Sequence, residues 1–465
     1  MVRRRHGQRS IFEMLLPDGD KLWDPTLRRI DEVLQDEGMT DLVVEALGRR
    51  WRHSVGRGRP GTPAEVVLRM LVLKHLYDWS FEECEREVRG SLVYRAFCRI
   101  GCESVPDDKT LIRLAPALGP DVLQRIVERL VRLARQRRVV RGLRLRVDTT
   151  VVETNIHYPT DSSLLADGVR VITRTVQKLG QVVGKKLRLR DRTRSVGRRV
   201  FAIVQKSRRV GEAAQADVKR LYRRLMGITR AVVREAHQAV RQAVRRSRNL
   251  KPAARERVPG LREQVRHMIE LTKRVLAQTK ARVLQGNTHY PHKLLSVFET
   301  HTEAIRKGKA AKPTEFGKLV KIQEAEGFIT DYEVCAQRVP DGDLWVPSLE
   351  RHQQLFGRPP RLAVADAGFA SAANERAAIE RGVARVALPG RGRLSASRRA
   401  HQRQRWFRRA LRWRTGSEGR ISVVKRRHGL RRCRYRGPAG VQRWVGLGII
   451  ASNLHALGRA AVAKT

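Results

Sequence analysis

The chain has 465 residues, is 41% hydrophobic and carries a formal charge of +51, from 97 Lys and Arg against 46 Asp and Glu. This length predicts about two to four domains, and the hydrophobic fraction is high enough for packed cores, which excludes a wholly disordered chain. Such an excess of positive charge repels itself unless a polyanion neutralises it. Nucleic acid is the usual polyanion, because each neutralised phosphate releases counterions, and a membrane surface is the rival partner.

The cysteines and the apolar segments bear on the compartment. The five cysteines are scattered and odd in number, and the one close pair, Cys98 and Cys102, has no second pair at zinc-site spacing. This pattern predicts reduced thiols in an intracellular protein. The apolar run at 11–16 is too short and too acidic for a signal peptide. The sequence has no run of about 18 apolar residues, so no membrane span is expected.

In chain order, a basic N-terminal segment (1–61) precedes a helical domain (62–137). Thr62-Pro-Ala-Glu65 has the form of an N-cap, a proline at N1 and a glutamate at N3, and Ser80 with Glu83 predicts a capping box. Residues 121–136 place leucines, isoleucine and valines on one helical face. With Arg95, Arg99, Lys109 and Arg113 nearby, the domain is either a DNA-binding helix-turn-helix or a packing and dimerisation domain.

Beyond residue 137 the pattern alternates between strands and helices. Residues 143–152 have the period-2, β-branched pattern of a strand, and 169–285 is helical and strongly basic, with Pro252 and Pro259 as breaks. Further strands are expected at 294–298, 318–323, 330–334, 362–365 and 383–388, and helices at 347–356 and 371–381. The sequence thus predicts an α/β core, 143–168 and 286–465, interrupted by a basic helical insertion.

Three carboxylates stand out in this basic chain. Glu418 is the one acid among 23 Lys and Arg in residues 381–465, and it is expected to begin a helix after Gly416-Ser417. On that helix Glu418, Ser422 and Lys425 would share a face. Asp148 lies within the strand 143–152, and Asp366 follows the apolar run 362–365, where α/β sheets place ligands.

Two divalent ions held by such acids can activate water and stabilise a leaving oxygen in phosphodiester cleavage, and Mg²⁺ or Mn²⁺ prefers carboxylate oxygens. Each acid also has a plainer interpretation. Asp366 can cap a turn, Asp148 can pair with Arg144 or Arg146, and Glu418 can favour a helix N-terminus. Their joint placement in a basic chain favours the metal site.

These residues lie in segments that resemble bacterial insertion-sequence transposases of the DDE type, closest to the ISNCY group. The segments that carry the resemblance are Val147–Asn155, Tyr158–Leu165, Ser296–Ile305 with Lys307–Lys309, Glu315–Gly317, Asp366–Ser371 and Gly446–Leu454, together with Pro106–Leu111 in the helical domain. The resemblance runs over roughly residues 60–455.

The resemblance implies an RNase H-like core in which Asp148, Asp366 and Glu418 are the catalytic, metal-binding acids, holding two Mg²⁺ or Mn²⁺ ions. Arg414, Glu418 and Lys425 form an R-x3-E-x6-K pattern similar to the Y-R-E-K signature, with Leu411 at the tyrosine position. Arg414 and Lys425 would then hold transposon-end phosphates. Further expected DNA contacts are Arg426, Arg427, Arg95 and Arg113. The insertion would serve end binding or dimerisation.

Other candidate sites have plainer explanations. His289, His292 and His301 are expected to touch DNA or pack in a loop rather than bind metal. Asp341 and Asp343 form a turn signature, with Asp343 as a reserve fourth acid. The glycines at 390–394 do not form a phosphate-binding loop, so no nucleotide cofactor is expected. The tryptophans among the C-terminal arginines could stack on bases or pack in the core: Trp406, Trp413 and Trp444.

The leading hypothesis is a cytoplasmic, nucleoid-associated transposase that cuts DNA at transposon ends and joins the 3′-hydroxyl to target DNA. Because two ends must be brought together, a homodimer on DNA is expected. The alternatives are a non-catalytic DNA-binding protein, such as a decayed or domesticated copy, and a structure-selective nuclease of the same fold.

Overall fold

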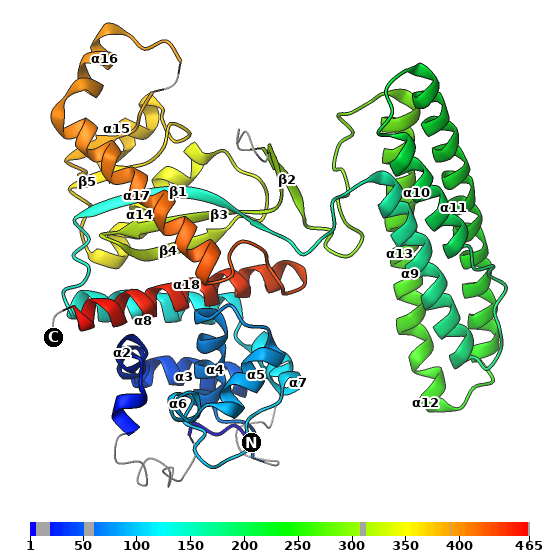
Figure 1. The fold of residues 1–465 in the computed structure, drawn as a ribbon, viewed down its shortest axis with the longest axis horizontal. Helices are drawn as coiled ribbons and strands as arrows, with labels where there is room; N and C mark the ends of the chain where they lie inside the picture. The colour runs from blue at the N-terminus through cyan, green and yellow to red at the C-terminus, as the bar shows by residue number, and fades with distance from the viewer. Residues whose placement is uncertain (6–18, 51–59, 307–312, 391, 464–465) are drawn as a thin grey trace. The chain divides into compact units, whose positions relative to one another are not determined.

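The computed structural model describes residues 1–5, 19–50, 60–306, 313–390 and 392–463 (Figure 1). The chain forms two compact units. One combines residues 1–155 with 305–465, and the other is residues 156–304. The second unit is therefore inserted between the first and the later strands of the first unit.

The N-terminal part of the first unit is helical, and its main helices are α2 (Pro25–Val33), α3 (Glu37–Gly48), α4 (Ala64–Leu76), α5 (Phe81–Gly90), α6 (Leu92–Phe97), α7 (Asp108–Leu114) and α8 (Pro120–Gln136). The capping box of Ser80 and Glu83 is confirmed, and the expected apolar face of α8 is buried. Helix α4 begins one residue later than expected, because Pro63 rather than Thr62 is its N-cap. Helices α2 and α3 were not expected from the sequence.

A mixed sheet forms the centre of the first unit, with strands β1 (Arg144–Glu153), β2 (Glu303–Arg306), β3 (Thr314–Ala325), β4 (Phe328–Val334), β5 (Leu362–Val364) and β6 (Arg385–Ala387). The order is β2-β3-β1-β5-β6, and β4 pairs with β3. Strand β1 is antiparallel to β3 and parallel to β5, and β5 is parallel to β6. The strand expected at 294–298 is wrong, since that segment is not in a strand.

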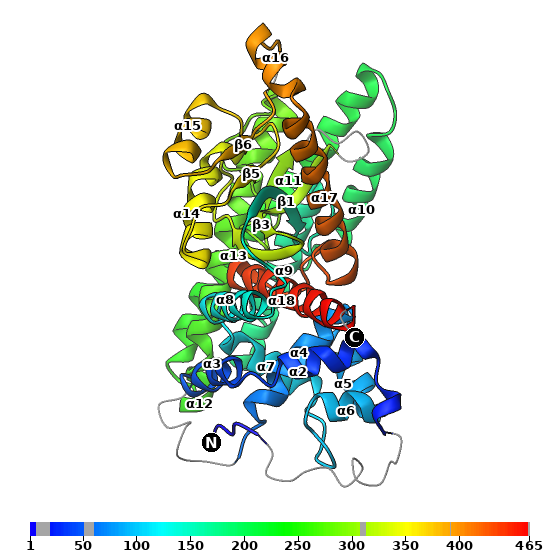
Figure 2. The same ribbon diagram turned by 90° about the vertical axis from the view of Figure 1, so that its left-hand side faces the viewer.

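Helices cover both faces of this sheet, as Figure 2 shows: α14 (Trp345–Phe356), α15 (Ala372–Glu380) and α17 (Arg405–Arg427). The short α16 (Ala396–Arg403) precedes α17 and packs on it. Trp345 of α14 and Ala378 of α15 pack with Val147 on one face. Phe407 and Ala410 of α17 pack with Val364 on the other. Because both faces are covered, β1 is buried almost continuously rather than at every second residue.

The C-terminal helix α18 (Gly437–Val462) joins the sheet to the N-terminal helices. It packs against α2, α4, α8 and β4, and its side chains belong to the same hydrophobic cluster as those of α4 and α8. By length and composition α18 could cross a membrane, but 67% of its most apolar window is buried inside the protein. Its apolar character is therefore explained by packing between two layers of the unit.

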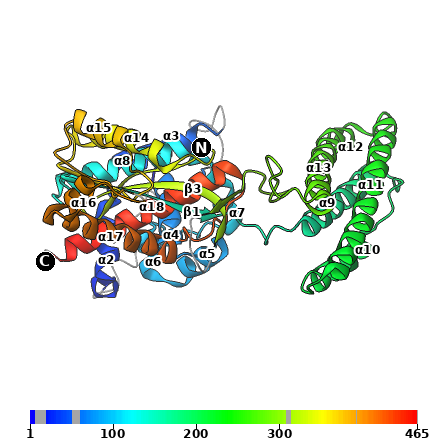
Figure 3. The same ribbon diagram turned by 90° about the horizontal axis from the view of Figure 1, so that it is seen from above.

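The second unit is a bundle of long helices, drawn green in Figure 3: α9 (Asp161–Val182), α10 (Thr193–Lys206), α11 (Glu212–Ser247) and α13 (Arg257–Thr279), with the short α12 (Pro252–Arg255) before α13. It has its own hydrophobic cluster, built from residues of all four long helices. Pro252 occupies the first position of α12, but Pro259 lies inside the first turn of α13, where a proline does not interrupt the helix.

Candidate active site

The pairing of β1 with β5 relates the positions of Asp148 and Asp366 along the two chain segments. The parallel register joins Arg144 to Leu362 and Arg146 to Val364. The parallel pairing ends there, so Asp148 and Asp366 each follow the last paired position of their segment by two residues. This correspondence holds although more than two hundred residues of sequence separate the two acids.

Asp148 faces helix α17. Successive strand residues alternate between faces, so Asp148 shares the side of Arg146, which donates a bond to the Trp413 carbonyl oxygen of α17. From α17, the Ser417 hydroxyl donates a hydrogen bond of 2.8 Å to Oδ2 of Asp148. Sequence reasoning missed Ser417, although the small pair Gly416-Ser417 beside Glu418 signals a close helix contact.

Glu418 lies on the same turn of α17 as Ser417, in the middle of the helix rather than at its start. Successive helix residues are rotated by about 100° about the axis, so Glu418 points away from the Ser417 contact. Its side chain is 67% exposed, and its Oε1 accepts a 3.3 Å bond from Arg414. The structure therefore places Asp148 and Asp366 at corresponding positions beyond the β1–β5 pairing and leaves the Glu418 carboxylate paired with Arg414.

A buried ion pair fixes α17 against the sheet. Arg146 on β1 pairs with Glu324, its cross-strand neighbour on β3, and both side chains are almost fully buried. Arg146 also donates a 2.7 Å bond to the carbonyl oxygen of Trp413, and its guanidinium lies 5.0 Å from the Trp413 ring centre. A Cβ at Gly416 would lie 2.4 Å from this guanidinium, so the helix approaches the strand closely at that point.

The donor set suits a hard divalent cation. Asp148 and Asp366 supply carboxylate oxygens, the ligands that Mg²⁺ and Mn²⁺ prefer. Among the described residues, no group of three or more His, Cys, Asp or Glu is placed to hold a metal. Two acids thus fit the ion, and Glu418 would join them only by leaving Arg414.

The aspartates also have the local bonds of their plainer interpretations. Oδ1 of Asp366 accepts a 2.7 Å bond from the Gly368 backbone N–H, which closes a turn. Oδ1 of Asp148 accepts a 2.8 Å bond from the Thr149 N–H. In the plainer interpretation Asp148 would pair with Arg144 or Arg146, but Arg146 pairs with Glu324 instead. The two backbone bonds orient the carboxylates.

Basic residues of α17 flank the acids. The Arg414 side chain is 19% exposed, and Lys425 lies 3.9 Å from Oε1 of the buried Glu315 on β3. Arg426 and Arg427 are exposed at the C-terminal end of the helix. Lys425 is therefore held toward the sheet by a carboxylate, whereas Arg426 and Arg427 face solvent.

Arg95 and Arg113 lie on the N-terminal helices rather than on the sheet. The Arg95 guanidinium donates to the carbonyl oxygens of Gly101 and Glu103, at 2.7 Å and 2.8 Å from Nη2, and so fastens the loop after α6. Arg113 is exposed on α7 and donates to the Thr110 hydroxyl. These bonds to the loop account for an arginine at position 95 without a DNA contact.

The remaining candidates have surroundings of their own. His301 lies 3.6 Å from the Glu299 carboxylate, and His289 and His292 are exposed. Asp341 accepts a 2.9 Å bond from the Thr149 hydroxyl, on the opposite side of β1 from Asp148. Trp444 is fully buried, so it serves the core.

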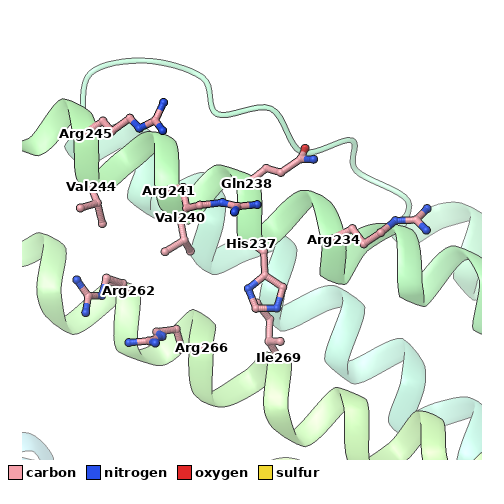
Figure 4. Close-up of a pocket in the computed structure, with 10 residues that line it drawn as sticks. All are labelled: Arg234, His237, Gln238, Val240, Arg241, Val244, Arg245, Arg262, Arg266 and Ile269. Carbon is pink, nitrogen blue, oxygen red and sulfur yellow. The ribbon is translucent and has the colours of Figure 1, made fainter.

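The insertion carries a second basic surface, in a hollow of about 700 Å³ between α11 and α13. Figure 4 shows five arginines around it: Arg234, Arg241, Arg245, Arg262 and Arg266. Burial and the nearby Lys273 lower the pKa of His237 at its centre, so this imidazole is neutral at pH 7. No carboxylate among the described residues forms an ion pair with these arginines, which leaves them available to an anionic partner.

Comparison with known proteins gives two family matches. Residues 12–115 match a family described as a transposase domain (DUF772), and residues 380–457 match a transposase DDE domain. The second match contains α17 with Glu418, whereas Asp148 and Asp366 lie outside both.

A further relative is an uncharacterized protein, ORF8 in the nfe locus of Rhizobium meliloti, 29% identical over 129 residues. That match covers 26% of this chain and 62% of the relative's length. No solved structure matches the chain at a comparable level of significance. The chain thus matches a transposase domain near one end and a transposase DDE domain near the other, and these two matches support an insertion-sequence DDE transposase.

Proposed function

We propose that this protein cuts DNA at the ends of its transposon and joins the freed 3′-hydroxyl to target DNA, in a reaction that depends on Mg²⁺ or Mn²⁺. The observation that carries the proposal is the β1–β5 register, whose continuation by two residues would set Asp148 opposite Asp366, together with the bond of Asp148 to α17, the helix that bears Glu418. The sheet, with antiparallel partners on one side of β1 and parallel partners on the other, supports an RNase H-like core.

Asp148 and Asp366 would hold the metal ions, and Glu418 would complete the set. When bound, such ions lower the pKa of an attacking water and stabilise the charge on the leaving oxygen. Ser417 orients Asp148 through its 2.8 Å hydrogen bond. A DNA phosphate near Arg414 would compete for its guanidinium and so release Glu418 toward the aspartates.

Each of the two units carries a basic surface that would bind the DNA. Arg426 and Arg427 extend the surface of α17, and the hollow between α11 and α13 offers five further guanidinium groups. Because the insertion's surface is itself strongly basic, we assign it to end binding rather than to contact with another copy of itself. Synapsis of two ends requires at least a dimer on DNA.

One observation favours a second candidate, a non-catalytic DNA-binding protein. Glu418 is exposed and paired with Arg414 rather than gathered with the aspartates. In a decayed or domesticated copy this arrangement would persist when DNA and metal are bound. Cleavage assays separate the two candidates.

The test uses purified protein and labelled DNA that spans the boundary of its own gene, with Mg²⁺ or with EDTA. We expect metal-dependent cuts at one reproducible position, reduced more than ~100-fold in Asp148→Asn, Asp366→Asn and Glu418→Gln, with DNA binding retained. Glu350→Gln, which changes an exposed acid on α14, is the matched control and should cut normally.

Each other outcome has a definite meaning. Binding without cuts would establish the non-catalytic candidate. Cuts scattered without regard to the boundary would identify a nuclease without end specificity. Normal cutting by all three acid variants would reject the assigned site.

A further inference from the structure

A second hollow, of about 1010 Å³, lies beside the first turns of α17. Its floor is the edge of the sheet where β1, β5 and β6 begin, and these segments are joined by backbone bonds from Arg361 to Leu143 and from Arg385 to Arg361. One wall is α17, from Gln404 to Trp413. We call it the tryptophan pocket, after Trp406 and Trp413 in its lining.

Aromatic rings and guanidinium groups alternate in this lining. Arg385 lies 5.6 Å from the ring centre of Trp406, and Arg144 lies 6.0 Å from that of Trp413. Both tryptophans are only partly buried. The lining arginines are Arg144, Arg361, Arg385, Arg405 and Arg409. No carboxylate lines the pocket, and none among the described residues forms an ion pair with these five arginines.

This combination fits an aromatic base joined to a phosphate. A base stacks on a tryptophan face, and guanidinium groups bind the phosphate or stack on the base in turn. The volume is that of a small-molecule site rather than of a flat surface for duplex DNA. A second copy of this chain is a poor occupant, because both surfaces would be basic.

The position of the pocket ties it to the proposed active site. Arg144 and Asp148 are four residues apart on β1, roughly 13 Å. Trp413 and Ser417 are one turn apart on α17, roughly 6 Å. A DNA strand whose phosphate lies at the aspartates would therefore pass the tryptophan pocket within a few nucleotides.

We propose that the tryptophan pocket holds an unpaired nucleotide of the DNA strand that is processed at Asp148 and Asp366. The choice of DNA over a free nucleotide rests on the proposed function, because α17 serves both sites. The pocket would fix the register of the strand, and it would favour ends that are already unpaired.

The test measures binding of a labelled single-stranded oligonucleotide to the full chain in EDTA, so that no result depends on cleavage. We expect Trp406→Ala to weaken binding roughly five- to hundredfold, and Trp406→Phe to restore most of it, because a smaller ring still stacks. Arg409→Ala should weaken binding several-fold. Arg408→Ala removes the same charge from an exposed neighbour outside the pocket and should change binding less than twofold.

Three results would overturn the proposal. Equal losses in Arg408→Ala and Arg409→Ala would show a general charge effect. Equal losses for duplex and single-stranded DNA would show backbone binding without a base in the pocket. Competition by free dAMP at the concentration of the oligonucleotide would make a free nucleotide the ligand. Failure of the cleavage assay alone leaves the binding result standing, so the two proposals fail separately.

Discussion

At the residue scale, Asp148 shows how a single side chain is placed by partners that are remote in sequence. Its strand was recognisable from the alternation of residues 143–152, and its acidity stood out among arginines. The hydrogen bond from Ser417 and the pairing of its strand with β5 depend on segments more than two hundred residues away. Local sequence therefore identified the acid but not the residue that orients it.

Arg146 and Glu324 give a prediction at this scale. Arg146→Met leaves the Glu324 carboxylate buried without a partner, and we expect a loss of about 3–5 kcal/mol in the free energy of unfolding. Arg146→Met with Glu324→Met should recover most of that stability, because no charge is then buried alone. Urea unfolding of the two variants measures the difference.

The same pair separates stability from positioning. Because the double variant still lacks the bond from Arg146 to the Trp413 carbonyl, its cleavage should stay below that of the unmodified protein. Full cleavage by the stable double variant would show that Arg146 does not position α17. Exposed Arg408→Met is the control for the loss of one positive charge.

At the element scale, α17 is the helix whose start the sequence predicted least accurately. Gly416-Ser417 was interpreted as the boundary before a helix, but α17 runs from Arg405 to Arg427 and contains Gly416 and Gly419 in its interior. Glycine weakens a helix, so a sequence-based boundary there is reasonable. The structure shows the reason for Gly416, since a side chain there would meet Arg146.

The two glycines of α17 make a matched pair for a test. Gly416→Ala would place a Cβ 2.4 Å from the buried Arg146 guanidinium, and we expect lower cleavage and a loss of about 1–3 kcal/mol in stability. Gly419→Ala meets nothing within 4 Å and should instead stabilise the protein by about 0.5–1 kcal/mol. Thermal unfolding and cleavage by both variants check this, and equal effects would contradict the close approach.

Residues 294–298 show why an apolar run alone does not make a strand. Leu294 and Val297 pack in the hydrophobic cluster of the insertion. The Leu294 backbone N–H and C=O both bond to the Gln278 side-chain amide, at 2.9 Å and 3.0 Å. The backbone groups that a neighbouring strand would pair are therefore already satisfied by a helix residue.

At the scale of the whole molecule, the core of the first unit is built from segments that lie far apart in the sequence. The N-terminal helices, β4 and α18 share one hydrophobic cluster, although they come from distant parts of the chain.

Three buried histidines lie within this unit. Burial lowers the pKa of His352 and of His428 to about 4, and lowers that of His75 well below its usual value.

These histidines predict acid lability. Each is neutral when folded but binds a proton near pH 6.5 when unfolded, so the unfolded state binds more protons between about pH 4 and 6.5. Stability should be complete above pH 6.5 and should fall as the pH drops toward 4. The expected loss is up to about 3 kcal/mol for each of His352 and His428.

Urea unfolding at pH 7.5, 6 and 5 measures this slope. His352→Gln keeps a side-chain N–H for the Gly142 carbonyl and should flatten the slope. His289→Gln changes an exposed histidine and should leave it unaltered. An unchanged slope in His352→Gln would assign the acid lability to other groups.

The sequence by itself determined the charge, which favours a polyanionic partner, most of the strands and helices, and three candidate acids, Asp148, Asp366 and Glu418. Periodicity, capping residues and composition are local, so they can be interpreted without a fold. Only the tertiary structure decided that β1 pairs with β5, that Ser417 and Arg146 join α17 to the strand, and that Arg95 fastens a loop. Register, helix approach and pocket lining arise from contacts between distant segments, and no local pattern encodes which segments will meet.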